Sequence, residues 1–151
     1  MKRIVRLLLG AAVAAQCLGA AAQDKVRSSS DEARLHAQAI ANGLSIGAAV
    51  QHRVADYYQH FNRFPTSNED ARFGPPKSFA SADVQSVTIS GDGVITIAMT
   101  EAAGVAGGTI VLTPVLSHNT DEHTVDWRCA SPSFSTISDD TSGVCSYSKL
   151  P

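Results

Sequence analysis

The sequence predicts an α+β fold, in which one long N-terminal amphipathic helix packs on a four-stranded antiparallel sheet and a disulfide loop follows at the C-terminus. Three observations support this prediction. Apolar residues recur at helical spacing before residue 62, short alternating segments follow residue 83, and two cysteines lie near the end of the chain. A helix and a sheet with one apolar side each must bury those sides against each other, which gives one core.

The first residues have the pattern of a secretory signal peptide. A basic start, Met1-Lys2-Arg3, is followed by the apolar run Leu7–Ala15 and by small residues up to Ala22. The apolar run is shorter than the about 20 residues that cross a membrane, so we expect cleavage rather than the alternative, an uncleaved anchor. The expected segments are a signal peptide (1–22), a polar lead-in (23–29) and a single domain (30–151).

The charge left after cleavage argues against nucleic-acid binding. Removing residues 1–22 takes away Lys2, Arg3 and Arg6, so 12 basic residues fall to 9 against 14 acidic ones, and the net charge becomes −5. Non-specific affinity for nucleic acid depends on clustered Lys and Arg. We expect a mature protein of this length to be soluble, without a membrane span.

The cysteines predict one disulfide. Cys17 leaves with the signal peptide, and in an oxidising export compartment the remaining pair, Cys129 and Cys145, is most simply bonded. A loop of this size gives about 3 kcal/mol of stability. The alternatives are two unpaired thiols, or a lipoprotein modified at Cys17; the residues before Cys17, Ala14-Ala15-Gln16, argue against lipidation.

The predicted helix runs from about Ser30 to about Asn62, and the approach to Pro65 ends it. Gly43 and Gly47 each weaken it by about 1 kcal/mol relative to Ala, and we interpret them as points of close approach to the sheet. The predicted strands are 84–89, 94–99, 109–113 and 124–129, joined by loops at 63–82, 102–108 and 116–123 and by a tight hairpin at 90–93.

Pro114 and residues 130–144 complete the expected sheet region. Pro114 either ends the strand ladder or marks an edge, because proline cannot donate a hydrogen bond to a neighbouring strand. Residues 130–144 are rich in Ser, Asp, Thr and Pro, and form the loop that the disulfide would tie down.

This arrangement resembles the globular domain of a Gram-negative type IV pilin. Four pieces in order carry the resemblance over about residues 40 to 146: Ala48–Tyr58 leading to Phe64–Ala71, then Ser86–Thr96, Gly107–Pro114, and Val125–Cys129 with Cys145. The sequence departs from the family pattern in its first residues. The family's leader ending in Gly, its N-terminal Phe and its assembly-guiding Glu have no counterpart here, which argues against entry into a filament by the usual route.

The resemblance implies that the disulfide loop is an exposed contact region. Its candidate partner-binding residues are Ser131, Ser133, Phe134, Asp139 and Asp140. Phe134 has two interpretations, since an aromatic side chain in a polar loop either anchors a partner or packs inward against the sheet.

Metal binding and catalysis have weaker support in the sequence. His52, Asp56 and His60 share a helix face, but two turns separate the histidines by about 12 Å, too far to hold one ion. Asp121-Glu122-His123 and Asp139-Asp140 lack the spacing of a metal site, and calcium requires about six to eight oxygens. No Gly-x-Ser-x-Gly nucleophile motif is present. We expect neither a metal nor another cofactor, and no enzymatic activity.

The predicted function is therefore that of an exported, periplasmic or secreted pilin-like protein with a structural, adhesive or accessory role connected with type IV pili. Its partners would be pilus subunits or a surface receptor. One rival is a filament subunit with a rebuilt start, and another is an exported ligand- or metal-binding module unrelated to pili. A hydrolase is the least favoured.

Overall fold

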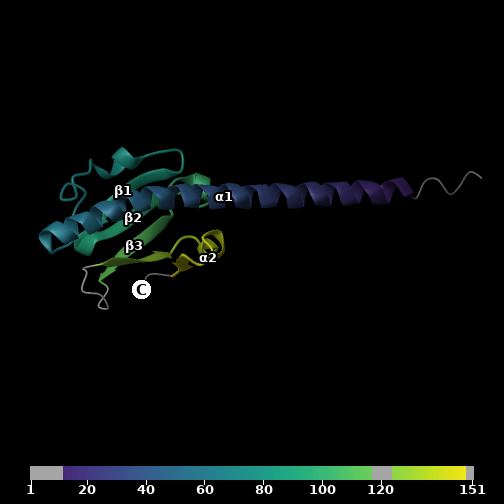
Figure 1. Cartoon of the computed structure of the whole chain (residues 1–151). Coiled ribbons are helices and arrows are strands. Elements are labelled where there is room, and N and C mark those ends of the chain that lie inside the picture. The colour runs from purple at the N-terminus through teal and green to yellow at the C-terminus, as the bar shows by residue number, and fades with distance from the viewer. Residues whose placement is uncertain (1–11, 117–123, 149–151) are drawn as a thin grey trace, which may run out of the picture. The chain divides into compact units, whose positions relative to one another are not determined.

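The computed structural model describes residues 12–116 and 124–148. The chain divides into two compact units, residues 1–34 and 35–151, and each is described by itself. The described part of the first unit is entirely helical and belongs to helix α1, Ala12–Phe61, whose remaining residues lie in the second unit. The sheet lies in the second unit (Figure 1).

Helix α1 begins earlier than the sequence predicted. The prediction placed its start near Ser30, but residues 12–29 are helical as well, including the polar segment 23–29. This stretch is rich in Ala and contains no proline, and Ala has the highest helix propensity, so nothing in it ends the helix. Cleavage after Ala22 stays a prediction, and residues 1–11 lie outside the described part of the chain.

The second half of α1 covers one face of the sheet (Figure 1). It buries the adjacent pair Ala39 and Ile40, and from Ile40 onward the buried residues are spaced three or four apart: Gly43, Gly47, Val50, Val54 and Tyr58. A Cβ at Gly43 would lie 2.7 Å from the sulfur of Met99, and one at Gly47 would lie 2.7 Å from Cδ1 of Ile97. Both glycines therefore allow the close approach of helix and sheet that the sequence suggested.

The sheet has five strands in the order in which they follow along the chain. They are β1 Val84–Ser90, β2 Val94–Met99, β3 Thr109–Leu116, β4 Val125–Ser131 and β5 Cys145–Tyr147. The first four are antiparallel neighbours, as predicted, and β5 pairs with β4 in parallel. The predicted number of four was wrong, because β5 has only three residues and no alternating pattern to reveal it.

Two details of the connections follow from local chemistry. The β1–β2 hairpin turns through the short 3-10 helix η2, Gly91–Gly93, where Asp92 has a φ of 59°. Strand β3 continues through Pro114, which the sequence placed at an end or an edge. The pairing of β3 with β2 stops at Leu112, so Pro114 lies beyond the last β2 partner and is opposite Trp127 on the β4 side.

The inner sides of the strands fill the core. Val87, Ile95, Ile97 and Ile110 are fully buried and face the apolar side of α1. Two further 3-10 helices, η1 Pro76–Phe79 and η3 Glu101–Ala103, and the short helix α2, Ile137–Asp140, lie in the connections. No helix within the described ranges combines the length and apolar character needed to cross a bilayer.

One side chain covers the middle of the free edge of β1. Asn68, only 7% exposed, donates from Nδ2 to the carbonyl oxygen of Val87 at 2.9 Å and accepts at Oδ1 from the amide of Ile89 at 2.7 Å. These are the two backbone groups that a further strand would pair with. The loop before β1 thus substitutes for one residue of a sixth strand.

Candidate functional site

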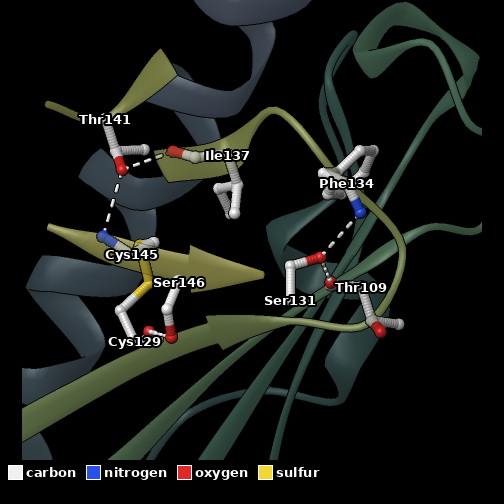
Figure 2. Close-up of a disulfide and its surroundings, with 8 residues drawn as sticks. All are labelled: Thr109, Cys129, Ser131, Phe134, Ile137, Thr141, Cys145 and Ser146. Atoms are coloured by element: carbon white, nitrogen blue, oxygen red, sulfur yellow. Dashed lines mark hydrogen bonds between the residues drawn. A yellow bond between two sulfur atoms is a disulfide. The ribbon is translucent and has the colours of Figure 1, made fainter. Parts of the chain in front are cut away.

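The disulfide predicted from the sequence is present, and it joins two neighbouring strands. Cys129 of β4 and Cys145 of β5 are register partners in the parallel pair, with their Cα atoms 4.5 Å apart (Figure 2). Cys145 is buried and Cys129 is partly exposed. The bond therefore closes the loop at the sheet and fixes the short strand β5 to β4.

Ser131 organises the first turn of this loop. Its side chain is fully buried, and the hydroxyl donates to the carbonyl oxygen of Thr109 at 2.6 Å. The same oxygen accepts from the amide of Ser133 and from that of Phe134, each at 3.1 Å. Figure 2 shows the bond to Phe134. One hydroxyl thus connects the start of the loop to β3 and to the next turn.

Ser133 and Phe134 also face the body of the domain. The hydroxyl of Ser133 accepts from the amide of Thr109 at 3.0 Å. Phe134 is 4% exposed and packs over Gly108, where an added Cβ would lie 2.5 Å from its Cζ atom. Of the two interpretations of Phe134, the structure shows the inward one, and the absence of a side chain at Gly108 makes room for it.

The second half of the loop is held by α2. Ile137, the first residue of α2, is fully buried. The carbonyl oxygen of Ile137 accepts from the hydroxyl of Thr141 at 2.6 Å. That hydroxyl in turn accepts from the amide of Cys145 at 3.0 Å (Figure 2). The helix is thereby linked to the disulfide through a single threonine.

The residues that this scaffold leaves at the surface are partly those predicted. Asp139 is exposed, and Asp140 is partly exposed and accepts from the hydroxyl of Thr136 at 2.8 Å. Val144 is 73% exposed, and Tyr147 in β5 is also exposed. Val144 and Tyr147 are not among the contact residues predicted from the sequence. For Val144 a signal was available, because it is an apolar residue directly before a cysteine in a polar loop.

The described candidate positions on α1 and in the disulfide loop are not brought together into a group of metal ligands. Among the residues that the structure describes, no three His, Cys, Asp or Glu side chains lie close enough to hold one metal ion. On the helix face, Nδ1 of His60 lies 2.7 Å from the carbonyl oxygen of Asp56, so this ring contacts the backbone of its own helix. The candidate triplet at 121–123 falls outside the described residues.

These observations define a pilin-like α+β domain: a long helix on a mostly antiparallel sheet, closed by a C-terminal disulfide loop. The family model for the pilin of bacterial filaments matches residues 37–142. This match covers more than half of the chain, and the chain belongs to the pilin family. It is therefore a pilin-like structural protein. No curated protein sequence matches it significantly.

Proposed function

We propose that the protein is exported and has a structural, adhesive or accessory role connected with type IV pili, without enzymatic activity. The family match over residues 37–142 supports a role among filament proteins. The signal-peptide pattern of residues 1–22 supports export to the periplasm, the medium or the cell surface. The role proposed is binding of other proteins, either pilus subunits or a surface receptor.

The disulfide loop is the proposed contact region. The observation that carries this proposal is that the loop is attached to the sheet at both ends, by Ser131 and by the disulfide, yet presents Asp139 and Val144 to solvent. A pre-ordered loop loses little conformational entropy on binding. In this proposal Asp139 and Asp140 contact the partner, whereas Ser131, Ser133 and Phe134 hold the loop in shape.

Photo-crosslinking in cells tests the contact region. A photoreactive amino acid placed at Asp139 or Val144 should give covalent adducts with a pilus subunit or a surface protein that mass spectrometry identifies. The matched control is Gln85, which is exposed on β1 at the opposite edge of the sheet. Adducts that form equally from all three positions, or from Gln85 alone, would contradict the proposal.

Shearing pili from the cells distinguishes a filament subunit from an accessory protein. A filament subunit should appear in the sheared pili together with the other subunits, because it is held in the fibre. An accessory protein should remain with the cell envelope or in the medium. Absence of both a filament association and any adduct from the loop would remove the connection with pili.

A further inference from the structure

A second candidate binding site lies where the last turns of α1 meet the loop that follows. Here the surface forms a pocket of about 220 Å³, lined by Arg53, Asp56, Tyr57, His60, Phe61, Asp70, Ala71 and Arg72. Sites for drug-sized ligands are typically about 300–1,000 Å³. The smaller volume suits one ring-sized group, held at the surface, better than a large ligand.

Three arginines in or beside the pocket make no ion pair with a described carboxylate, although the charge of Arg63 acts on Asp70 from a longer distance. Arg53 and Arg72 line it, and the guanidinium of Arg63 lies 5.1 Å from the centre of the Tyr57 ring beside it. Within the described residues the only ion pair joins Arg34 to Asp31, so none of these three arginines is in ion-pair contact with a described carboxylate. Each guanidinium therefore retains N–H donors that match a ligand carboxylate in two-pronged geometry.

Aromatic side chains keep two of these arginines in place. Arg53 lies over the ring of Phe73 at 5.9 Å, and Arg63 over Tyr57 as described. A guanidinium stacked on a ring keeps its N–H groups at its edge, where a ligand can reach them. Of the two arginines that line the pocket, Arg53 is thus positioned before any ligand arrives, which reduces the entropy lost on binding.

Phe61 provides an apolar platform in the same pocket. It is 56% exposed although it is a large apolar residue, and its ring lies against that of Tyr57, with 4.5 Å between the centroids. The negative face of an aromatic ring attracts the weakly positive C–H groups of a sugar ring. An exposed ring next to arginines outside any described ion pair is therefore suited to a ligand with both a flat C–H face and a negative charge.

The acidic residues of the pocket narrow the ligand class further. Asp70 already accepts from the amide and hydroxyl of Thr66, at 2.9 and 2.7 Å, whereas Asp56 offers an acceptor to ligand hydroxyl groups. Two carboxylates beside the arginines leave the pocket with little excess of positive charge, which disfavours nucleic acid, whose binding requires such an excess. They are compatible with one carboxylate per ring and several hydroxyls.

We propose that this helix-end pocket binds a uronate residue of an acidic saccharide. Arg53 and Arg72 bind the sugar carboxylate, Phe61 packs on the C–H face of the ring, and Asp56 accepts hydrogen bonds from its hydroxyls. The pocket shares no residue with the disulfide loop, so this binding and the protein contacts proposed for the loop can succeed or fail separately.

Titration of the full-length protein with tetragalacturonate, followed by calorimetry and by NMR, tests the proposal. We expect saturable binding, with the largest shifts at the amides of Arg53, Phe61 and Arg72. Because two-pronged charge-assisted contacts are lost, the double variant Arg53→Gln/Arg72→Gln should weaken binding by about tenfold or more. Phe61→Ala should weaken it as well, and Arg53→Lys, which keeps the charge, should have a smaller effect.

The controls separate this site from general electrostatic attraction. Arg34→Gln removes an exposed arginine elsewhere on α1 and should leave affinity unchanged. Galactotetraose, the uncharged analogue, and tetraglutamate, an acidic peptide, should bind at least about tenfold more weakly, because each lacks one half of the recognised chemistry. Circular dichroism checks that each variant is folded, and the exposed Phe61 can be replaced without disturbing the core.

Several results would overturn the proposal. These are the absence of saturable tetragalacturonate binding, an equal loss of affinity in Arg34→Gln, and binding of the neutral or peptide probe as tight as that of the uronate. Unchanged affinity in every folded pocket variant would place the ligand elsewhere and would equally reject this site.

Discussion

The two edge strands of the sheet, β1 and β5, are attached to the rest of the domain by different means. At β1 the side-chain amide of Asn68 donates to the carbonyl oxygen of Val87 and accepts from the backbone amide of Ile89. At β5 a covalent bond from Cys145 to Cys129 holds the strand in place. Asn68 occupies backbone groups that an unpaired edge would offer to another chain, whereas the disulfide lies on the side of β5 that pairs with β4 and fixes the strand there. The difference is that only the β5 edge depends on the redox state of the compartment.

The largest expected effect is at the covalent edge. The double variant Cys129→Ser/Cys145→Ser should lower the free energy of unfolding by about 3 kcal/mol, because the unfolded chain regains the entropy of an open loop. Urea unfolding followed by circular dichroism measures the loss. Reduction of the wild-type protein should reproduce it, and an unchanged unfolding curve under both treatments would show that β5 does not depend on the disulfide.

Removing the Asn68 side chain at the β1 edge should lower the free energy of unfolding somewhat less than removing the disulfide. Asn68→Ala leaves the Val87 carbonyl and the Ile89 amide without partners, and we expect a loss of about 2 kcal/mol. Hydrogen exchange should become faster at the Ile89 amide, since that group loses its acceptor. Glu69→Ala, at the exposed neighbouring position, is the matched control. Equal effects of both variants would mean that the loop, not the amide, closes the edge.

A smaller effect is expected where the disulfide loop joins β3. Ser131→Ala removes the hydroxyl that Thr109, Ser133 and Phe134 share, and should cost about 1–2 kcal/mol. The same unfolding measurement applies, with the exposed Ser135→Ala as control. If Ser131→Ala costs nothing in the oxidised protein but is destabilising after reduction, the disulfide alone positions the loop.

The smallest expected effect is the pH dependence of stability that comes from Asp70, in the loop before β1. Hydrogen bonds from the side chain and then the amide of Thr66, with the charge of Arg63 contributing, lower the pKa of Asp70 below its ordinary value of 3.8. A carboxyl group with a lowered folded-state pKa stabilises the fold above the unfolded-state pKa, and this contribution is lost as pH falls through the folded-state value. Wild type should therefore lose its advantage over Asp70→Asn below about pH 4.

Thr66→Val provides the control for this titration. It removes the hydroxyl that donates to Asp70, so the acid-dependent difference between proteins with and without the Asp70→Asn substitution should shrink. Unfolding free energies measured from pH 7 to pH 2 make the comparison. A difference that persists unchanged without the hydroxyl would assign the pH dependence to other carboxyl groups.

The elements that the sequence predicted are those with a repeating pattern. The apolar stripe of α1 and the alternation in β1 and β2 each involve many residues, so single exceptions do not hide them. Strand β5 could not be predicted in this way, because three residues show no period and its partner β4 is distant along the chain. Helix α1 starts earlier than predicted, because the polar residues 23–29 look like a helix boundary although their helix propensity is adequate.

In the candidate site, too, some features could be predicted from the sequence and others could not. The disulfide could be predicted from the number of cysteines and the expected compartment, independently of the fold. The structural roles of Ser131 and Asn68 could not, because each depends on backbone groups brought near by folding: Thr109 for Ser131, and Val87 and Ile89 for Asn68. A serine or asparagine in a polar loop looks the same whether it is exposed or buried.

The parallel pairing of β4 and β5 limits how the loop between them can vary. Two adjacent parallel strands need a connection of about a dozen or more residues, and residues 132–144 are close to that minimum. Deletions in this segment would pull Cys145 out of register with Cys129. We therefore expect natural or engineered variants of this loop to carry substitutions or insertions. A loop shorter than the present one would not connect the two strands.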